Sequence, residues 1–527
     1  MQRRDLLKAA AGAGILAAPR LAGAAGARVL RFVPQANFAN LDPVWGTQYV
    51  VRNASLLVWD TLYGLDSGLV PRPQMCEGHE RSDDGLSWDF RLRAGLRFHD
   101  GEPVRARDVV ASLNRWMARD AMGQVLKARL DALEAVDDVR FRFRLRAPFP
   151  KLLLALAKPM PNLAAIMPER VAATDPFKQI GDYIGSGPMV FRRDEWVPGS
   201  RVVFARFDGY VPRSEPSDWL AGGKRMLVDR VEWQIIPDPG TAAAALQNGE
   251  IDWWETPIPD LVPLLRQSPG VRVDIADPLG NVGLLRFNHL YPPFNDVRAR
   301  QAVAMVMNQA DEMHAVVGSD DALWRPMPSV FTPGTPLYTE AGGEILKGPR
   351  DYTAAKARLA ASGYNGEKVV MLVATDLAIT KGQSDVTADI LTRLGMNVDY
   401  VATDWGTVGA RRAKQDPPAK GGWNIFHTWL AGLDCALPAT NIALRTNGPK
   451  AWFGWPSSEE IQGLITRWYD APDARVEHDV AAALNRAALD FLPYVPTGFF
   501  LGYQAWRADL TGIVKAPFPV FWGVGRG

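Results

Sequence analysis

Residues 96–104 read LRFHDGEPV, and ARDVVASL follows at residues 106–113. The centre of this stretch, His99-Asp100-Gly101, is typical of a tight turn, because a carboxylate there can bond the local backbone and glycine adopts a positive φ at no steric cost. Asp108 stands in the first turn of a predicted helix, where its charge suits the helix dipole. We expect a strand–turn–helix unit in which His99 is a hydrogen-bonded packing residue rather than a metal ligand.

The alternation of apolar and polar residues extends this unit on both sides. Residues 88–93 (WDFRLR) and 139–145 (VRFRFRL) alternate as strands with one wet face do, and residues 108–117 place apolar side chains on one helical face. From residue 229 onwards, strands and helices alternate. We expect strands at 231–236, 282–287, 369–374, 398–401 and 424–428, and helices at 242–248, 297–308, 351–362, 384–394 and 475–491. This order indicates an α/β protein with layered helices.

Size and composition exclude several classes of protein. With 527 residues, two or three domains are expected. Lys and Arg total 59 and Asp and Glu total 58, so the net charge of +1 favours neither nucleic acid nor an anionic membrane as a partner. The 18 tryptophans suggest a binding surface, because an excess of these broad apolar rings often lines one.

The first 27 residues have the pattern of an export signal. Arg3, Arg4 and Lys8 form a basic region, an Ala-rich run follows, and Ala-Gly-Ala sequences at 22–24 and 25–27 are candidate cleavage sites. The Arg pair resembles a twin-arginine motif, although an ordinary signal with a chance Arg pair is the alternative. Because no cysteine follows either site, we expect a soluble periplasmic protein without a lipid anchor.

The chain contains none of the common short motifs for catalysis, metal binding or phosphate binding. The six histidines show no ligand spacing, and there is no H-E-x-x-H, G-x-S-x-G, P-loop or C-x-x-C motif. We therefore predict a protein that is not an enzyme and has no cofactor and no metal site.

Several segments occur in the order that one known family shows. The chain resembles the family 5 extracellular solute-binding proteins, the oligopeptide, dipeptide and nickel receptors of ABC importers, in residues 96–113. The resemblance continues at Asn40-Leu41-Asp42-Pro43, Thr61-Leu62-Tyr63, Gly185-Ser186-Gly187-Pro188, residues 246–252 (LQNGEID), Phe287-Asn288, Pro292-Pro293-Phe294 and residues 297–302 (VRARQA).

The resemblance implies a two-lobed periplasmic binding protein fold, of type II in its large peptide-binding cluster, with an inserted subdomain. Lobe I would comprise residues 28–58, 200–282 and 495–527, the inserted subdomain 59–199, and lobe II 283–494. The expected function is hinge closure around a peptide or peptide-like polar solute, which a monomeric receptor delivers to a membrane permease. A secreted hydrolase with cleft carboxylates and a nickel or metal-chelate receptor remain the alternatives.

The family's cleft-lining segment matches residues 427–435 (HTWLAGLDC). In the peptide receptors an aspartate three residues after the tryptophan pairs with the ligand ammonium, whereas this chain has Gly432 there. Asp434 is the candidate replacement, and Trp429 the candidate cleft wall. Three further ligand-binding candidates are Asn288, Trp45 and Trp405. Cys76 and Cys435 would lie in different parts of the fold, so we expect two free thiols.

Overall fold

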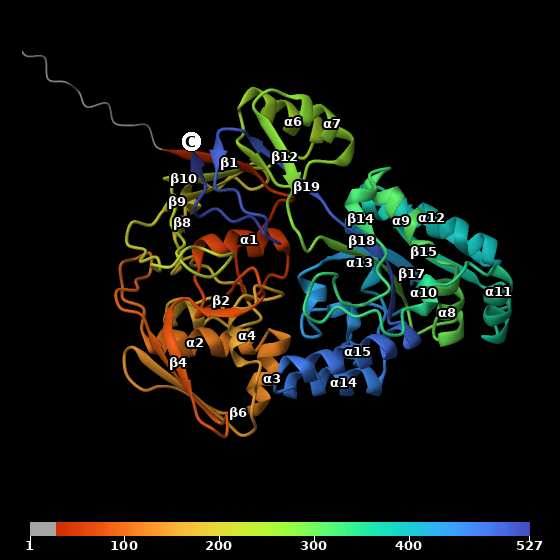
Figure 1. The fold of residues 1–527 in the computed structure, drawn as a ribbon, viewed down its shortest axis with the longest axis horizontal. Coiled ribbons are helices and arrows are strands. Elements are labelled where there is room, and N and C mark those ends of the chain that lie inside the picture. The colour runs from red at the N-terminus through yellow and green to blue at the C-terminus, as the bar shows by residue number, and fades with distance from the viewer. Residues whose placement is uncertain (1–27) are drawn as a thin grey trace, which may run out of the picture.

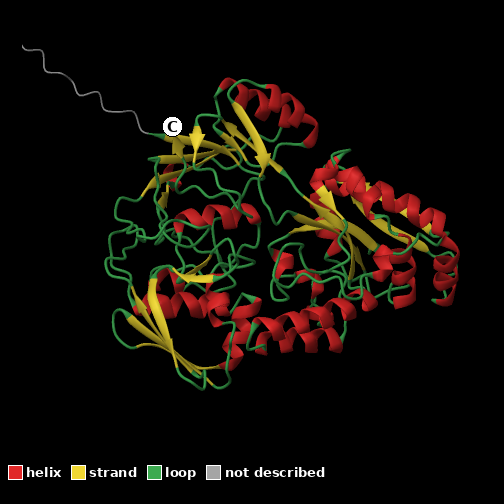
Figure 2. Ribbon diagram, in the orientation of Figure 1, coloured by secondary structure: helices red, strands yellow, loops and turns green. Residues whose placement is uncertain are grey.

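The computed structural model describes residues 28–527, and the predicted export signal at 1–27 lies outside the described residues. Three larger sheets of seven, six and four strands divide the described chain into three bodies (Figure 1). The chain is a mixed α/β protein in which long helices cover the sheets (Figure 2).

The seven-stranded sheet, called lobe I here, is built from distant parts of the chain. The strand order is β12-β19-β11-β1-β10-β9-β8, and β1 runs parallel to both of its neighbours. The strands are β1 (Val29–Val33), β8 (Met189–Phe191), β9 (Arg201–Arg206), β10 (Arg230–Gln234), β11 (Trp253–Trp254), β12 (Val271–Ile275) and β19 (Tyr503–Arg507). The helices are α1 (Tyr49–Val58), α6 (Pro239–Asn248) and α7 (Val262–Gln267), and a small pair, β20 (Leu510–Thr511) with β21 (Gly525–Arg526), lies near the C-terminus.

Much of the tryptophan content lies in the core rather than on a surface. Seven tryptophans are among the largest fully buried side chains. In lobe I, Phe32 packs against Trp253 and Phe521 with ring centroids 5.1 and 5.0 Å apart. The sequence-based interpretation of the tryptophan excess as a binding surface is therefore wrong for these seven residues.

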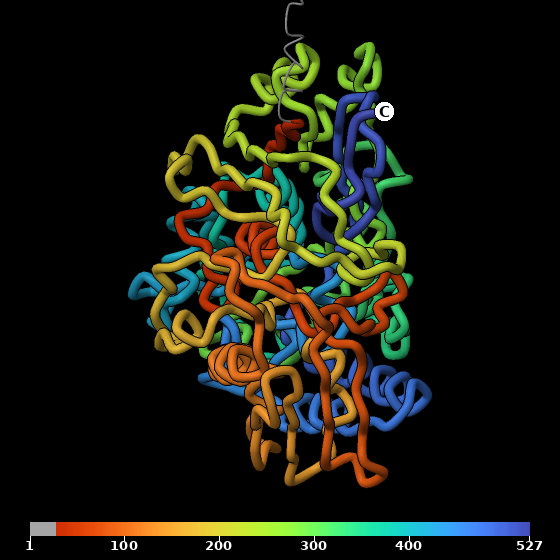
Figure 3. The backbone as a smooth tube through the Cα atoms, turned by 90° about the vertical axis from the view of Figure 1, so that its left-hand side faces the viewer, coloured from red at the N-terminus to blue at the C-terminus, as the bar shows by residue number. Residues whose placement is uncertain are grey.

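The inserted subdomain has a four-stranded antiparallel sheet in the order β4-β5-β7-β6. Its strands are β4 (Cys76–Arg81), β5 (Ser87–Leu92), β6 (Leu130–Ala135) and β7 (Arg140–Leu145), with a nearby pair β2 (Tyr63–Leu65) and β3 (Pro71–Pro73). Its helices are α2 (Ala106–Met117), α3 (Ala121–Arg129), α4 (Leu152–Ala157) and α5 (Glu169–Ala172). Figure 3 shows this part of the chain at the opposite end of the molecule from the C-terminus.

The predicted turn at residues 99–101 is confirmed. Gly101 has φ +88°, and the Asp100 carboxylate accepts a hydrogen bond from the Glu102 N–H. His99 Nδ1 accepts from the Gly185 N–H at 3.2 Å, and His99 Nε2 is 3.0 Å from the Gly187 carbonyl oxygen. Two of the segments that carry the family resemblance, residues 96–113 and 185–188, are thus hydrogen-bonded to each other through His99. His99 is therefore a packing residue.

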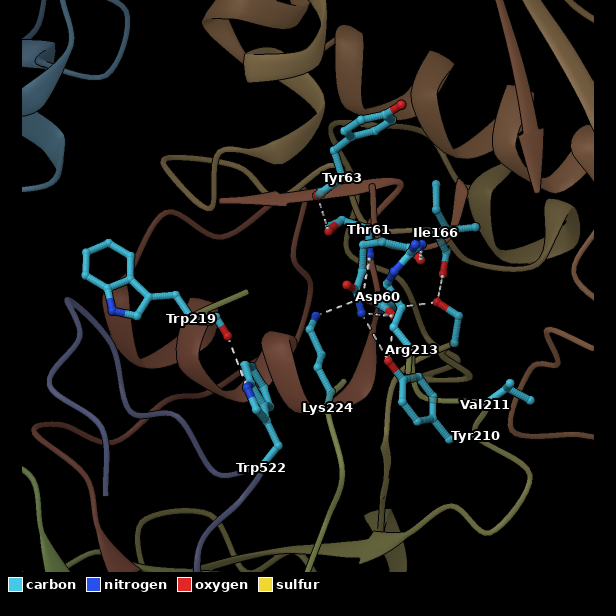
Figure 4. Close-up of polar contacts among 12 residues, drawn as sticks. Asp60, Thr61, Tyr63, Ile166, Tyr210, Val211, Arg213, Trp219, Lys224 and Trp522 are labelled. Atoms are coloured by element: carbon cyan, nitrogen blue, oxygen red, sulfur yellow. Dashed lines mark hydrogen bonds and ion pairs between the residues drawn. The ribbon is translucent and has the colours of Figure 1, made fainter. Parts of the chain in front are cut away.

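A buried ion pair joins the inserted subdomain to lobe I (Figure 4). Asp60 accepts hydrogen bonds from Lys224 Nζ at 2.8 Å and from the Tyr210 hydroxyl at 2.8 Å. The Asp60 and Lys224 side chains are each 1 % exposed, so losing either partner would leave an uncompensated buried charge. A second buried pair, Arg115 with Asp42 at 2.8 Å, anchors the segment before α1 to α2. Both ion pairs are almost fully buried, so they join the two parts through charges that water does not screen.

The six-stranded sheet forms lobe II in the order β14-β18-β13-β17-β15-β16. Its strands are β13 (Asn281–Phe287), β14 (Trp324–Arg325), β15 (Lys368–Ala374), β16 (Asn397–Thr403), β17 (Ile425–Ala431) and β18 (Tyr494–Phe500). Its helices are α8 (Val297–Val306), α9 (Gln309–Val317), α10 (Glu344–Lys347), α11 (Tyr352–Ala361), α12 (Ala378–Leu394), α13 (Trp405–Arg412), α14 (Glu459–Asp470) and α15 (Ala474–Phe491).

The sheets place two strands differently from the predicted boundaries. β8 pairs with β9 in lobe I, although it falls within the range 59–199. β18 pairs with β13 in lobe II, although most of it falls within 495–527. In both cases the strand crosses the predicted boundary because sheet pairing, rather than position in the sequence, assigns it to a body.

The lobes are connected by two chain crossings and touch again far from them. The crossings lie between β12 and β13 and between β18 and β19, and Ala276 donates a backbone hydrogen bond to Gly502 across them. At the opposite side, α14 and α15 lie against the inserted subdomain (Figure 1), where Lys151 Nζ is 2.6 Å from Glu477 Oε1. Arg129 also pairs with Asp470 at 2.6 Å. Lobe II is therefore in contact both with lobe I, at the crossings, and with the inserted subdomain, through α14 and α15.

Candidate functional site

One tyrosine of lobe I is hydrogen-bonded directly to lobe II. Tyr49, the first residue of α1, donates from its hydroxyl to Asp434 Oδ2 at 2.5 Å and accepts from the Ala431 N–H at 2.9 Å. Ala431 ends β17, and Asp434 begins the 3-10 helix Asp434–Ala436 directly after it. The end of a lobe II strand and the start of a lobe I helix thus form one cluster.

Arg52 lies one turn along α1 from Tyr49, with its guanidinium carbon 5.0 Å from the Tyr49 ring centroid. Its Nε and Nη2 donate to Asn53 Oδ1, and Nη2 also donates to the Pro517 carbonyl at 3.0 Å. The third nitrogen, Nη1, is buried and has no hydrogen-bond partner among residues 28–527. A buried cation with one unused donor is therefore held at the contact between the lobes.

Two further carboxylates lie around Arg52. Glu255, just after β11, accepts from Asn53 Nδ2 at 2.9 Å and from the Gln35 N–H at 2.7 Å. Asp277 lies in the crossing between β12 and β13 and accepts from the Leu279 N–H at 2.7 Å. The charges of Asp434, Glu255 and Asp277 all favour the ionised form of the Arg52 guanidinium.

Burial dominates the electrostatics of this cluster. Desolvation raises the pKa of Asp434 to about 6, although the Tyr49 hydrogen bond and the nearby Arg52 charge both favour the ionised form. Desolvation likewise raises the pKa of Glu255 and of Asp277 to about 7. Asp434 Oδ1 is buried and has no hydrogen-bond partner in the described chain. An unpaired buried polar group costs about 1–3 kcal/mol, so a solute that bonded these atoms would stabilise this arrangement.

Gly432 has a structural reason for carrying no side chain. A Cβ at this position would lie 1.7 Å from the Leu279 carbonyl oxygen, and the Gly432 N–H donates to the Gly280 carbonyl at 2.7 Å. The chain therefore packs against its own crossing segment where the peptide receptors have an aspartate. Asp434 is the acid that reaches the lobe contact.

Trp429 lies in β17, two residues before Ala431 and opposite Gly283 of β13. It is half-buried and packs against the main hydrophobic core. β17 extends three residues beyond the predicted end at residue 428, which places Trp429 and Ala431 within the sheet.

Asn288 lies at the other end of the lobe II sheet. β13 pairs antiparallel with β17 from Asn281 opposite Ala431 to Phe287 opposite Ile425, so Asn288 is about 20 Å along the strand from the cluster. Its side chain is buried, donates to the Trp423 carbonyl and accepts from the Leu290 N–H. These bonds are those of a structural turn residue.

The remaining two candidates have contacts of their own. Trp45 lies in the turn before α1, where its backbone N–H donates to Asp42 and its carbonyl accepts from Arg119. Trp405 begins α13, and its ring lies 4.8 Å from the guanidinium carbon of Arg412. Within residues 28–527, the side-chain hydrogen bonds of Tyr49 and Asp434 involve neither tryptophan.

Arg412 occupies a box of aromatic rings in lobe II. Besides Trp405, its guanidinium carbon lies 4.8 Å from the Phe453 ring and 5.6 Å from the Phe426 and Trp452 rings. Burial lowers the pKa of Arg412 to about 10, and its Nε has no hydrogen-bond partner within residues 28–527. The aromatic run at 452–455 therefore serves partly to stack on this cation.

Sequence reasoning missed Tyr49, Arg52, Glu255 and Asp277. A signal was present for Arg52, because Arg-Asn interrupts the otherwise largely apolar helix YVVRNASLLV, and nine of these ten residues are buried. A charged residue in such a helix requires a buried partner or a function. Glu255 and Asp277 gave no comparable pattern.

Two features are absent from the part of the chain that the structure describes. Residues 28–527 contain no group of three or more His, Cys, Asp or Glu side chains that could hold a metal ion. No helix in the same residues has both the length and the apolar character needed to cross a membrane.

Cys76 and Cys435 are both buried free thiols in the structure, as expected.

Comparison with known proteins gives the family. The model of the bacterial extracellular solute-binding proteins, family 5 middle region, matches residues 70–431. The chain belongs to this family. It is thus a solute-binding protein with the type II periplasmic binding fold, as the sequence motifs predicted.

Relatives of this family member cover nearly its whole length. A probable peptide ABC transporter periplasmic-binding protein of Sinorhizobium fredii is 36% identical over 99% of both chains. The glutathione-binding protein of Escherichia coli K12 is 26% identical over 91% of each chain. The solved structure of the Helicobacter pylori binding protein DppA with the peptide STSA has a TM-score of 0.78, 21% identity and coverage of 94% of this chain and 98% of that one.

Proposed function

We propose that this family 5 protein is the periplasmic receptor of an ABC importer for a peptide or peptide-like polar solute. It captures the solute between its lobes and delivers it unchanged to a membrane permease. The observation that carries this proposal is the pair of unused buried atoms at the lobe contact, Arg52 Nη1 and Asp434 Oδ1. Two relatives support the same class of ligand, because one is named as a probable peptide ABC transporter periplasmic-binding protein and the other as a glutathione-binding protein.

The mechanism follows from differential affinity for two states. When the lobes meet without a solute, each unpaired buried atom costs about 1–3 kcal/mol, so the empty closed state is penalised. A solute with an ammonium for Asp434 and an acceptor for Arg52 removes this penalty only when both lobes contact it. Ligand binding therefore shifts the population towards closure, and the permease can distinguish loaded from empty receptor.

Thermal unfolding and X-ray scattering test this proposal. The mature protein is mixed with a panel of dipeptides, tripeptides and γ-linked peptides, followed by nickel–histidine and sugars. A binding solute should raise the apparent Tm and reduce the radius of gyration. If no peptide or peptide-like compound does either, while nickel–histidine or a sugar does, the proposed ligand class is wrong.

The hydrolase alternative has a direct test, since a receptor should return its ligand intact. Mass spectrometry of the bound solute after prolonged incubation is expected to show an unchanged mass. Asp434 and Trp429 are the ligand-binding residues that this proposal uses. The predictions for Trp45 and Trp405 stay predictions, and the bonds of Asn288 favour a structural role for it. For Trp429, replacement by alanine should weaken binding by about 2 kcal/mol in a still-folded protein.

The proposal includes the route of export and the oligomeric state of the protein. The Arg3-Arg4 pair supports export by the twin-arginine pathway, whose substrates usually cross the membrane folded, and the mature protein should act as a soluble monomer. Replacing both arginines with lysine should abolish export in a strain that depends on the twin-arginine pathway, and light scattering of the mature protein should give the mass of one chain.

A further inference from the structure

Resting on the proposed function, we infer that the inserted subdomain is the latch of the closed receptor. Three of its residues, Arg129, Phe149 and Lys151, bind the turn between α14 and α15 of lobe II. They hold lobe II in the closed arrangement without contacting the solute. The latch therefore strengthens the binding of every solute by the same factor, and the residues between the lobes decide which solute is preferred.

Lys151, the residue before α4, carries a buried ammonium whose hydrogen-bond partners within residues 28–527 all belong to lobe II. Its side chain is 6 % exposed, and Nζ donates to the Ala471 carbonyl at 2.9 Å and to Glu477 Oε1 at 2.6 Å. Nζ also lies over the Trp468 ring, 5.3 Å from its centroid. The ammonium thus has one partner in lobe II for each of its three N–H groups. Separation of the two parts would remove all three partners at once.

An aromatic pair excludes water from the same contact. Phe149 of the inserted subdomain stacks on Tyr469 of α14, with ring centroids 6.1 Å apart and planes inclined by 28°. Both side chains are buried. Because little water reaches this contact, the neighbouring charges are screened less than those of an exposed ion pair.

Arg129, the last residue of α3, adds a second ion pair to the latch. Its Nη1 lies 2.6 Å from Asp470 Oδ1 and donates to the Pro148 carbonyl at 2.9 Å. Its guanidinium carbon is 5.3 Å from the centroid of the Phe149 ring. Since Arg129 contacts both the aromatic pair and the α14–α15 turn, the contacts of the latch should form and break together.

The latch lies far from the hinge. The two chain crossings connect β12 with β13 and β18 with β19, whereas α14 and α15 meet the inserted subdomain at the other side of the molecule (Figure 1). A rotation of lobe II about the crossings moves the most distant residues furthest. A small opening therefore takes Lys151 Nζ out of hydrogen-bond distance of Glu477. The latch thus contributes to the closed state alone, which is what a shift of the closure equilibrium requires.

A carbodiimide tests the latch in solution without any solute. The reagent joins a contacting amine and carboxylate as an amide, with loss of one water molecule. Tryptic mass spectrometry of the treated mature protein should find Lys151 linked to Glu477. Lys381 and Asp385 are the matched internal control, because they pair within α12 and should be linked whether the lobes are open or closed.

Two variants show whether the contacts act as one unit. Arg129→Gln should lower the yield of the Lys151–Glu477 link at least twofold relative to the control link. Arg142→Gln removes an ion pair with Asp89 inside the subdomain sheet and should leave the yield unchanged. The inference is overturned if Arg129→Gln has no effect. It is also overturned if the latch link is absent both without solute and with the tightest peptide of the panel, while the control link forms.

The affinity of the receptor gives the second measurement. Lys151→Met keeps a long apolar side chain but removes the ammonium, so it should weaken the two tightest peptides of the panel by the same factor, at least threefold. A purely structural role for Lys151 would change the Tm and leave both Kd values as they are. Unequal factors for the two peptides would place Lys151 at the solute. Either result overturns the latch.

Failure of the proposed function has a different signature. If no peptide of the panel binds, but the Lys151–Glu477 link forms and Arg129→Gln weakens it, the proposed ligand class is wrong and the latch remains. If peptides bind and Lys151→Met leaves their affinities unchanged, the latch is wrong and the peptide receptor remains.

Discussion

Asp434→Asn should make the empty protein more stable and the receptor weaker. In the folded state burial raises the pKa of Asp434 to about 6, from its ordinary value of 3.8. At pH 7.5 this shift means that holding the group ionised costs about 3 kcal/mol, a figure that already includes the help of Tyr49 and Arg52. Asparagine has the same shape and no charge, but its amide adds a donor that must find a partner. We expect a net gain of about 1–2 kcal/mol.

The pH dependence of this gain has a definite sign. Because the folded pKa of Asp434 is raised, its protonated form stabilises the wild type at low pH, and that stability is lost as the pH rises from about 4 through about 6. The variant lacks this titration. The two proteins should therefore have similar apparent Tm values near pH 4, and the variant should have the higher value above pH 6.

Ligand affinity should move in the opposite direction. An ammonium group needs the ionised carboxylate, so the wild type should lose about fivefold in affinity for the tightest solute of the panel between pH 6 and pH 5. Asp434→Asn should bind at least tenfold more weakly at pH 7.5 and show a flatter profile. Scanning fluorimetry and calorimetry from pH 4 to pH 8 measure both effects. A lower Tm with unchanged affinity at pH 7.5 would refute the reasoning.

Two further predictions concern the contacts that hold the halves of the molecule. Gly432→Ala should lower stability by about 2–4 kcal/mol, because its Cβ would meet the Leu279 carbonyl oxygen at 1.7 Å. Gly409→Ala is the matched control, since its Cβ meets no atom within 4 Å and it lies in a helix, so thermal unfolding should show no loss. Glu477→Gln should raise the Kd several-fold, because Lys151 loses its ionic partner across the lobe contact. Calorimetry with the same solute checks this, and an unchanged Kd would mean that the ion pair does not favour closure.

The local elements of the fold follow from the sequence because their patterns are local. The turn at 99–101, the strand at 369–374 and the last long helix have signals within a few residues, and the structure has them within one or two residues of the expected bounds. α12 is an exception: it begins at Ala378, six residues before the predicted start. Its first turns lack a strong apolar periodicity, and tertiary packing of Thr380 and Gln383 supplies the burial instead.

The candidate site was only partly visible in the sequence. Asp434 could be named because it stands beside the expected acid position, and Arg52 could have been noticed as a charge in a largely apolar helix. The partnership between them could not be found, because Tyr49 and Asp434 are 385 residues apart. A contact of that separation depends on how two whole lobes meet.

The sequence by itself determined the family, the α/β elements and the absence of the usual acid at residue 432. Those properties depend on residue types and on short spacings along the sequence, which can be recognised without knowledge of the fold. Only the tertiary structure showed why residue 432 must be glycine and which atoms at the lobe contact lack partners. Steric exclusion by a carbonyl of another segment, and the burial of an unpaired charge, arise from distances between parts of the chain that no linear pattern encodes.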